Sequence, residues 1–474
     1  MTNEFAQQVT FAKSLIAPVS PVAPAPALPL WPARDPAGWV IDGDVLSGAR
    51  FHPATPDGAC WAILLLLMND ELNGDPAAQG LVRTILERYS GRAASGPGAS
   101  RSGDGIFRHW INPADGQVKP GWDPEYATLS TMKMVLGAAR AAAYYPGDAS
   151  IQLSAREIIC GVRNWDAYVN TSTNATYFKG LEFGDPDLSS AASPFHEGMI
   201  FAEQAAAYGG IPSQDVYTRW LERWRWPSAA LVSGKSIVGV QSGSFLSAFV
   251  SLYELLVMED YRSDPQWQSQ VLNLRLSNAA WTDDNGPKYN TVFSAGTTKT
   301  EWGGYRADSL NNHPGDITTF TSLMAFAAGT GAPGGSTPEA VAAYNAYRRG
   351  ARQGFAGGAN MLYRRSNVDQ AYTPNSAGLP DVVLGALGLA ELIDAGSVAR
   401  VLTGPYPSCA PRCGPADFDG DGDTGTDLDI EAFFACLGGD CCTACWSADF
   451  DGDGDSGTDL DIEAFFRVVG GGNC

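Results

Sequence analysis

The feature that most constrains this chain is a near-perfect repeat close to its end. Residues 417–434 read DFDGDGDTGTDLDIEAFF and return as residues 449–466, with Ser456 in place of Thr424 as the only difference. The period is 32 residues, which is typical of one supersecondary unit that is used more than once. The sequence therefore predicts two copies of a single structural unit at the C-terminal end.

Each copy begins with aspartates at alternating positions around a glycine, and an apolar helix follows. Oxygen ligands with this spacing suit calcium in an EF-hand loop, so we favour a calcium site over a merely solvated acidic run. Position 12 of the loop falls on Leu428 and Leu460, and we expect Asp427 and Asp459 to complete the coordination instead. The predicted ligands are the loop aspartates: Asp417, Asp419, Asp421, Asp423, Asp427, Asp449, Asp451, Asp453, Asp455 and Asp459.

Residues 409–474 resemble a dockerin module, because two calcium loops are each followed by a single helix. The resemblance implies calcium-dependent folding and attachment to a cohesin-like protein or a cell surface. Seven cysteines lie in this region without paired histidines, which favours disulfides over a zinc site. We expect the pairs Cys413–Cys441 and Cys445–Cys474, one bridge for each repeat, although the spacing leaves the connectivity open.

Disulfides predict a secreted or cell-surface protein. The segment from Met1 to Ile16 has no apolar stretch of the signal-peptide type, so we expect the sequence to begin near the mature end or at a trimmed start. The apolar run Trp61–Met68 is too short to span a membrane. The net charge is −21, with −13 in residues 409–474, which argues against nucleic acid as a partner. We expect a monomer.

The chain before residue 395 reads mainly as helices. We expect a proline-rich arm at 1–35, a helical domain at 36–395 and a linker at 396–416 before the repeats. The expected helices are Trp61–Leu72, Ala77–Tyr89, Tyr126–Tyr145, Ile151–Trp165, Phe195–Tyr208, Asp215–Trp226, Gly243–Glu259, Pro265–Ala280, Ile317–Ala328, Pro338–Gly354 and Val382–Ile393. Paired helices with long loops predict an all-α (α/α)6 barrel with its site at one mouth. A plain helical bundle with shorter loops is the alternative.

Aromatic and acidic residues gather in the long loops 93–124, 170–194 and 282–315, and such loops are usually functional. The sequence contains no P-loop, dinucleotide fingerprint, G-x-S-x-G elbow or H-E-x-x-H site. Its four histidines are not spaced as a metal set. Carboxylates among aromatic residues are the materials of glycoside hydrolysis, so the sequence predicts chemistry on sugars without a catalytic cofactor.

A series of loop and helix-start motifs in residues 100–395 resembles the glucoamylase-like family, whose relatives include bacterial endo-β-1,2-glucanases. The motifs are, in order, Asp104–Trp110, Leu129–Thr131, Pro194–Met199, Glu301–Tyr305, Pro314–Ile317 and Gly378–Asp381. The resemblance implies an (α/α)6 barrel with a sugar-binding cleft and an inverting mechanism. One departure is clear: Thr128 and Lys133 stand where the family usually carries two acids.

The resemblance places the general acid at Glu197 and the base at Asp381, with Asp316 as the competing base. A helix-start role is the alternative for both Glu197 and Asp381. For Asp104 and Asp123, two roles stay open: binding of sugar hydroxyls and capping of a turn. For the aromatic residues and histidines, contact with sugar and a structural role likewise both stay open. The predicted substrate-binding residues are Asp104, His109, Trp110, Trp122, Asp123, Phe195, His196, Trp302, Tyr305, Arg306 and His313.

The sequence thus predicts a secreted glycoside hydrolase that cleaves inside a linear β-glucan, with β-1,2-glucan or sophoro-oligosaccharides as the first substrate to test. Three alternatives stay open: a transglycosylase on the same glucan, a lyase on an acidic polysaccharide, and a glycan-binding protein without catalysis. The chain before the repeats also has a net negative charge, which disfavours the lyase, because a lyase needs a basic cleft for its anionic substrate.

Overall fold

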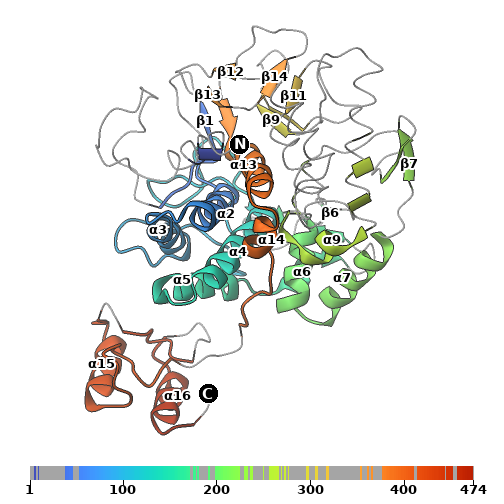
Figure 1. Ribbon diagram of the computed structural model, residues 1–474. Coiled ribbons are helices and arrows are strands. Elements are labelled where there is room, and N and C mark those ends of the chain that lie inside the picture. Colours follow the sequence, from blue (N-terminus) through green and yellow to red (C-terminus); the bar gives the residue numbers. More distant parts are fainter. Residues whose placement is uncertain are drawn as a thin grey trace. The chain divides into compact units, whose positions relative to one another are not determined.

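The computed structural model describes residues 38–45, 53–170, 198–224 and 376–472, the last with gaps at 410–413, 443–444 and 452–455. Residues 5, 6 and 9 and short segments between 175 and 366 complete the description. The chain divides into two compact units, Met1–Pro407 and Ser408–Cys474. Figure 1 labels the elements of each unit. Apart from residues 5, 6 and 9, the expected proline-rich arm lies outside the described residues, as do most residues of the expected helices between 243 and 354.

The first unit is built from inner and outer helices. The inner helices are α2 (Pro56–Asn73), α4 (Thr128–Tyr144), α6 (Gly198–Tyr208) and α13 (Leu379–Ile393). The outer helices are α3 (Ala78–Ser90), α5 (Ala149–Cys160) and α7 (Ile211–Trp224). The inner helices are apolar on nearly every side, as in the buried run Ile63–Met68, whereas α3 and α5 bury one face only. A helix that is apolar all round must be surrounded by protein, so the sequence itself decides which helices lie inside.

Successive inner and outer helices form hairpins. The pairs α2 with α3, α4 with α5, and α6 with α7 are in contact, and α2 also packs against α4 and α13 (Figure 1). The last inner helix therefore lies beside the first, which closes the described part of the ring. Among the described helices, none combines the length and the apolar character needed to cross a bilayer.

The N-terminal ends of α2 and α13 are held together by Asp42. Thr55 caps α2 by accepting a hydrogen bond from the Gly58 backbone N–H at 2.9 Å. The Thr55 hydroxyl in turn donates to the Asp42 carboxylate at 3.1 Å, and the Leu379 N–H donates to the Asp42 carbonyl at 2.8 Å. Both inner helices consequently start at the same end of the unit.

Short antiparallel strands lie in the segments that precede and connect the helices. They are β1 (Gly43–Val45), β2 (Tyr126–Ala127), β3 (Val169–Asn170), β4 (Ala175–Tyr177), β5 (Lys179–Gly180), β6 (Ala191–Ala192), β7 (Ala229–Val232), β8 (Lys235–Val238), β9 (Ala295–Thr297), β10 (Tyr305–Ala307), β11 (Ile317–Thr319), β12 (Gln353–Gly354), β13 (Asn360–Met361), β14 (Arg364–Ser366) and β15 (Ser376–Gly378). The pairs are β1–β15, β9–β10, β11–β14, β12–β13, β2–β5 and β7–β8, with β3, β4 and β6 in one sheet. Strand β11 replaces the start of the helix expected at Ile317–Ala328, because three consecutive β-branched residues favour a strand. Gln353 and Gly354, the last two residues of the helix expected at Pro338–Gly354, form the strand β12 instead.

Helix α14 (Ser397–Leu402) occupies part of the range that was expected to be a linker. Val398, Val401 and Leu402 are buried, at the i, i+3 and i+4 spacing of a helix with one apolar face. The short helix α9 (Glu259–Ser263) is joined to this region by an ion pair of 3.1 Å between Arg262 and Glu391. The first unit thus continues to Pro407, and the expected linker at 396–416 begins with folded structure.

The second unit packs its two repeats around a shared aromatic core. Its helices are α15 (Asp427–Leu437) and α16 (Asp459–Val469). Phe433 and the equivalent Phe465 stack with ring centroids 4.1 Å apart, and Phe418 and Phe450 pack against them. Each helix begins with a capping box, formed by Thr426 or Thr458 and the aspartate three residues later. The duplication predicted from the sequence is therefore also a duplication of structure.

The disulfides of this unit are more local than expected. Cys441 pairs with Cys436, and Cys445 pairs with Cys442, in place of the expected partners Cys413 and Cys474. The reason is the turn that ends α15: the Asp440 N–H donates to the Ala435 carbonyl at 2.9 Å, which reverses the chain and returns the next residue to the helix end. Cys413 and Cys474 lie outside the described residues.

Candidate functional site

Asp381 lies in the first turn of α13 and is only 4% exposed. The helix begins after Gly378, and a Cβ atom added to that glycine would lie 3.2 Å from the Asp381 Oδ2 atom. The carboxylate therefore folds back over the start of its own helix. The positive end of the helix dipole favours negative charge at this position. Burial of an acid here is compatible with either reading of Asp381, as a helix-start residue or as a base.

Several predicted site residues lie outside the described part of the chain. They are Glu197, Asp316, Phe195, His196, Trp302 and His313, together with the side chains of Tyr305 and Arg306. Their neighbours in sequence are placed: α6 begins at Gly198, directly after Glu197, with its first turn buried. The backbone of Tyr305 and Arg306 forms β10, which pairs with β9, and β9 contacts the strand β15 that leads into α13.

The loop at 99–127 is fastened over the N-terminal ends of α2 and α4. Ala54, next to the cap of α2, exchanges two backbone hydrogen bonds of 2.9 Å with Ile111. The Phe107 N–H donates to the Thr131 hydroxyl in the first turns of α4, and the Ala127 N–H donates to the Phe107 carbonyl, both at 2.9 Å. Since Asp42 ties the starts of α2 and α13, this loop and Asp381 belong to the same end of the inner helices.

Three predicted sugar-contacting rings of this loop lie together. The His109 and Trp110 rings stack with centroids 3.6 Å apart at 19°, and the Trp122 centroid lies 4.8 Å from that of Trp110. Trp122 is 36% exposed, which leaves a large apolar ring at the surface. Exposed aromatic rings of this kind stack on the apolar faces of flat ligands. The structure therefore brings His109, Trp110 and Trp122 into one cluster, which we call the aromatic loop cluster.

The sequence prediction did not include Glu125, whose carboxylate contacts the Nδ1 atom of His109. The two residues are 16 positions apart, and they meet because the loop doubles back on itself. The His109 N–H donates to the Glu125 carbonyl at 3.2 Å, which aligns the two backbone segments. No local spacing rule signals a pair of this kind. The signal lies only in the hairpin-like course of the loop.

The two acids of the loop that the sequence predicted as site residues, Asp104 and Asp123, have different surroundings. The Asp104 carboxylate accepts a hydrogen bond from the Asn164 side chain at 2.6 Å, and its carbonyl accepts one from the Arg163 N–H at 2.8 Å. The next residue, Gly105, has φ +80°, so Asp104 holds a tight turn. Asp123 is exposed beside Trp122. This geometry favours the turn-capping role for Asp104. Asp123 follows Trp122 of the aromatic loop cluster directly and stays a predicted sugar contact.

Lys133 occupies the place of an expected family acid, and the structure supplies it with a carboxylate from another helix. The Lys133 Nζ atom lies 2.8 Å from the Asp57 Oδ2 atom and 4.7 Å from the ring centroid of Tyr253. Lys133 is buried, and a buried cation requires a partner charge. Asp57 stands in the first turn of α2, at the same end as Asp381.

A second buried polar network surrounds Tyr406, after α14. The Tyr406 hydroxyl donates to the Glu203 Oε2 atom at 2.8 Å, and the Arg140 guanidinium lies 5.0 Å from the Tyr406 ring centroid. Arg140 also donates to the Gly404 carbonyl, and the Tyr208 hydroxyl donates to the Pro407 carbonyl at 2.9 Å. Burial raises the pKa of Glu203 to about 7, while the bond from Tyr406 and the charge of Arg140 oppose that shift. These contacts fix residues 404–407 to α4 and α6.

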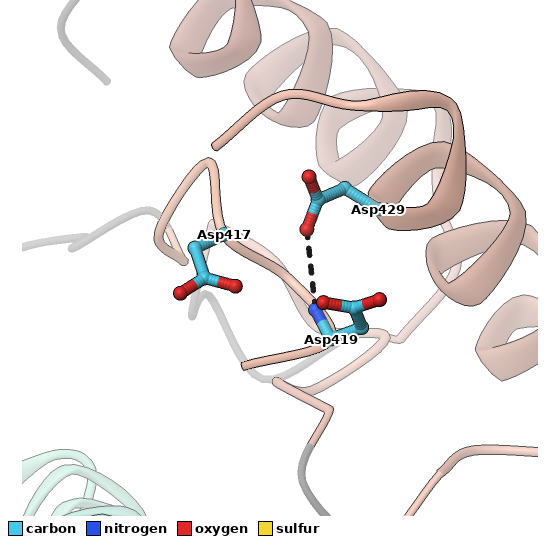
Figure 2. Close-up of side chains that lie close together, drawn as sticks. All are labelled: Asp417, Asp419 and Asp429. Atoms are coloured by element: carbon cyan, nitrogen blue, oxygen red, sulfur yellow. Dashed lines mark hydrogen bonds between the residues drawn. The ribbon is translucent and has the colours of Figure 1, made fainter. Parts of the chain in front are cut away.

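Two clusters of aspartates in the second unit can hold metal ions. In the first, one carboxylate oxygen from each of Asp417, Asp419 and Asp429 lies within 4.8 Å of the others. Figure 2 shows these three side chains. The Oδ1 atom of Asp417 is buried and has no hydrogen-bond partner within the described residues. A buried carboxylate oxygen without a donor needs a cation to offset its desolvation, so the residues present fit a bound metal. The second cluster is formed by Asp449, Asp451 and Asp461.

The acids that complete these clusters are Asp429 and Asp461, two residues beyond the expected Asp427 and Asp459. Asp427 and Asp459 begin the helices and are exposed, whereas Asp429 turns back toward the loop as part of the capping box. Burial would raise the pKa of Asp429, but hydrogen bonds from Thr426, Asp419 and Phe418 outweigh it and lower that pKa. Asp421 and Asp423 are exposed outside the first cluster, and Asp453 and Asp455 lie outside the described residues.

No protein-family profile matches the chain, and no curated protein matches it. Solved structures do resemble it. An endo-β-1,2-glucanase from Chitinophaga pinensis, in complex with sophorotriose and glucose, aligns with a TM-score of 0.62 and 17% identity over 85% of this chain and 94% of its own. The first unit is an (α/α)6 barrel. This confirms the fold class expected for the first unit.

Two further structures have the same fold. A putative glucoamylase from Bacteroides fragilis aligns with a TM-score of 0.64 and 17% identity, over 85% of this chain and 92% of its own. An endo-β-1,2-glucanase from Talaromyces funiculosus, in complex with sophorose, aligns with a TM-score of 0.54 and 12% identity, over 84% of this chain and 86% of its own. At such identities the likeness is one of architecture.

Proposed function

We propose that this protein is a glycoside hydrolase that cleaves internal linkages of β-1,2-glucan with inversion at the anomeric carbon. The observation that carries the proposal is the position of Asp381: a buried carboxylate at the start of an inner helix, at the end of the barrel that also bears the aromatic loop cluster. The fold is shared with proteins named as endo-β-1,2-glucanases that hold sophorose or sophorotriose.

In this proposal Glu197 protonates the glycosidic oxygen and Asp381 accepts a proton from the attacking water. The transfer to Asp381 is direct or passes through a substrate hydroxyl, and Asp316 is the competing base. Inverting enzymes need one carboxylic acid and one carboxylate on opposite sides of the scissile bond. Trp122 and Trp110 support a sugar ring by stacking, while His109 and Asp123 contact its hydroxyls. Phe195, His196, Trp302, Tyr305, Arg306 and His313 are the further proposed sugar contacts.

The test combines a substrate panel with three variants. Wild-type protein is incubated with linear β-1,2-, β-1,3- and β-1,4-glucans, and released reducing ends are measured. We expect release from β-1,2-glucan, and a loss of at least about 100-fold in kcat for Glu197→Gln and Asp381→Asn, in line with removal of a general acid or base. Glu259→Gln, an exposed acid of the same unit, is the matched control and should retain full activity. Full activity in Glu197→Gln would overturn the assignment of the acid.

Product analysis separates the alternatives. Larger or cyclic glucans would indicate transglycosylation, and unsaturated ends that absorb in the ultraviolet would indicate a lyase. Binding without turnover across the panel would indicate a glycan-binding protein. Each of these results contradicts the proposed hydrolysis and names the activity that replaces it.

For the second unit we propose a calcium-dependent, dockerin-like attachment module on a secreted or cell-surface protein. All three side chains of each aspartate cluster offer oxygen, which is the ligand that calcium prefers. The local disulfides suit an oxidising compartment. A cohesin-like protein or the cell surface is the proposed partner. Calorimetric titration with calcium and with magnesium tests the metal, and a pull-down from secreted proteins with and without calcium tests the attachment.

A further inference from the structure

Glu125 lies next to the aromatic loop cluster, where its carboxylate contacts the imidazole of His109, and this pair bears on how a sugar is held. We infer that Glu125 is a positioning residue: it orients His109 so that the Nε2 atom of His109 accepts a hydrogen bond from a hydroxyl of a neutral sugar. The inference rests on the proposed function and deepens it, because it assigns a substrate class to this part of the site.

The pair is held from several directions. The Glu125 carboxylate contacts the Nδ1 atom of His109, and the two residues are also joined through the backbone at 3.2 Å. The residues on either side of the pair are also joined: the guanidinium of Arg108 lies 4.0 Å from the Tyr126 ring centroid and donates to the Pro124 carbonyl. The side chains of His109 and Glu125 are 25% and 10% exposed. Glu125 is thus the more enclosed partner, placed behind the imidazole rather than at the surface.

Stacking fixes the plane of the imidazole while Glu125 fixes its rotation. The Trp110 ring stacks on it with the centroids 3.6 Å apart and the planes 19° from parallel, so one face of the imidazole is covered. A ring that is held at one nitrogen and on one face has little rotational freedom left. The Nε2 atom makes no hydrogen bond within the described residues. Trp122, next to Trp110 and 36% exposed, provides the surface on which a sugar ring can stack within reach of that nitrogen.

The chemistry of the pair decides what the Nε2 atom can bind. An ionised carboxylate only accepts hydrogen bonds, so Nδ1 carries the proton that it donates to Glu125. In the neutral imidazole the other nitrogen is then an acceptor. An acceptor selects a donor, and a sugar hydroxyl is one. A uronate at the same place would bring a second negative charge toward Glu125. The pair therefore favours neutral glucans over acidic polysaccharides.

The test measures binding in a Glu197→Gln background, which keeps the glucan intact. The affinity for a sophoro-oligosaccharide is measured by calorimetry for this parent, for added Glu125→Gln and Glu125→Ala, and for added Glu157→Gln. Glu157 also pairs with a cation, Arg92 at 2.7 Å, but it belongs to α5 and not to the loop at 99–127, so it is the matched control. We expect a loss of affinity of about tenfold for Glu125→Ala, a smaller loss for Glu125→Gln, whose amide oxygen still accepts from Nδ1, and no change for the control.

Two further readouts separate positioning from folding. With Glu197 intact, Glu125→Ala should raise KM severalfold and change kcat by less than about twofold, with an unchanged melting temperature. Nitrogen chemical shifts of the histidine rings should show a proton on Nδ1 of His109. Unchanged affinity in Glu125→Ala, or a proton on Nε2 of neutral His109, would overturn the inference. If the parent bound glucan but wild type did not cleave it, only the proposed reaction would fail. No glucan binding by the parent would overturn both.

Discussion

Glu203→Gln is the substitution whose effect on stability follows most directly from the structure. The Glu203 carboxyl is enclosed by α6 and residues 404–407 and accepts a hydrogen bond from the Tyr406 hydroxyl at 2.8 Å. Burial raises its pKa from 4.5 to about 7; the bond from Tyr406 and the charge of Arg140 lower it, and Asp260 adds to the increase. Glutamine keeps the shape of the protonated acid and an oxygen that accepts from Tyr406, but it never becomes charged.

The direction of the pH effect follows from proton binding. Between pH 4.5 and 7 the folded protein holds a proton on Glu203 that the unfolded chain has released, so the free energy of unfolding falls as the pH rises through this window. The pKa difference of about 2.5 corresponds to about 3 kcal/mol at most, at 1.36 kcal/mol for each pKa unit. The variant lacks this loss. It should match wild type near pH 4.5 and be more stable by up to about 3 kcal/mol at pH 8.

Urea unfolding of the full chain at pH 5 and pH 8, followed by tryptophan fluorescence, tests this prediction. The quantity to compare is the difference between variant and wild type at each pH, because all other titrating groups then cancel. Glu259→Gln, an exposed acid of the same unit, is the control and should show no pH-dependent difference. The reasoning would be refuted if Glu203→Gln differed from wild type by the same amount at both pH values.

Three further substitutions probe the metal clusters and the core. Asp429→Asn should weaken calcium binding by the second unit at least tenfold, because Asp429 lies in the cluster of possible ligands. Asp427→Asn should change the affinity by less than threefold, as measured by calorimetry. Equal losses of affinity in the two variants would contradict the assignment of Asp429 as the closing ligand. Leu64→Ala, in the fully buried part of α2, should lower the free energy of unfolding of the first unit by about 2–5 kcal/mol, and a loss below about 1 kcal/mol in urea unfolding would contradict its place in the core.

Local patterns predicted much of the architecture. The helices α2, α3, α4, α5, α6, α7 and α13 were expected near their observed positions, because their sequences are rich in apolar residues at helical spacing. The helix expected at Ile317 was wrong at its start, where a β-branched triplet forms β11. Helix α14 was missed because it is short and lies between prolines and glycines, and its burial depends on helices far away in sequence.

In the repeats, the sequence indicated the loops but not the closing acid. Counting twelve positions from Asp417 reaches Leu428, so Asp427 was the nearest candidate. In the structure Asp429, rather than Asp427, lies in the cluster with Asp417 and Asp419, because the capping box with Thr426 turns its carboxylate back toward the loop. The threonine–x–x–aspartate spacing at 426–429 carries this signal in the sequence. The disulfides were beyond prediction, since their pairing depends on the chain reversal after α15.

The pairs at the candidate site show where reasoning from sequence stops. Lys133 stands where the family that the sequence resembles usually carries an acid. Nothing local in the sequence indicated that Asp57 of another helix would neutralise this lysine. His109 was a candidate on its own, and Glu125 became part of the site only once the loop was seen to fold back. Long-range charge pairs depend on the packing of distant segments, and that packing is not encoded in any short motif. Glu197 and Asp316, as candidate acid and base, stay predictions that activity must test.

The most direct test of the account is the size and anomeric configuration of the products that wild-type protein forms from linear β-1,2-glucan, followed in real time by proton NMR. The account predicts short sophoro-oligosaccharides whose newly formed reducing ends appear first as the α-anomer, because an inverting reaction reverses the β-configuration. It also predicts that Glu197→Gln abolishes this signal. Products that appear first as the β-anomer, or an intact glucan after prolonged incubation with folded protein, would contradict it.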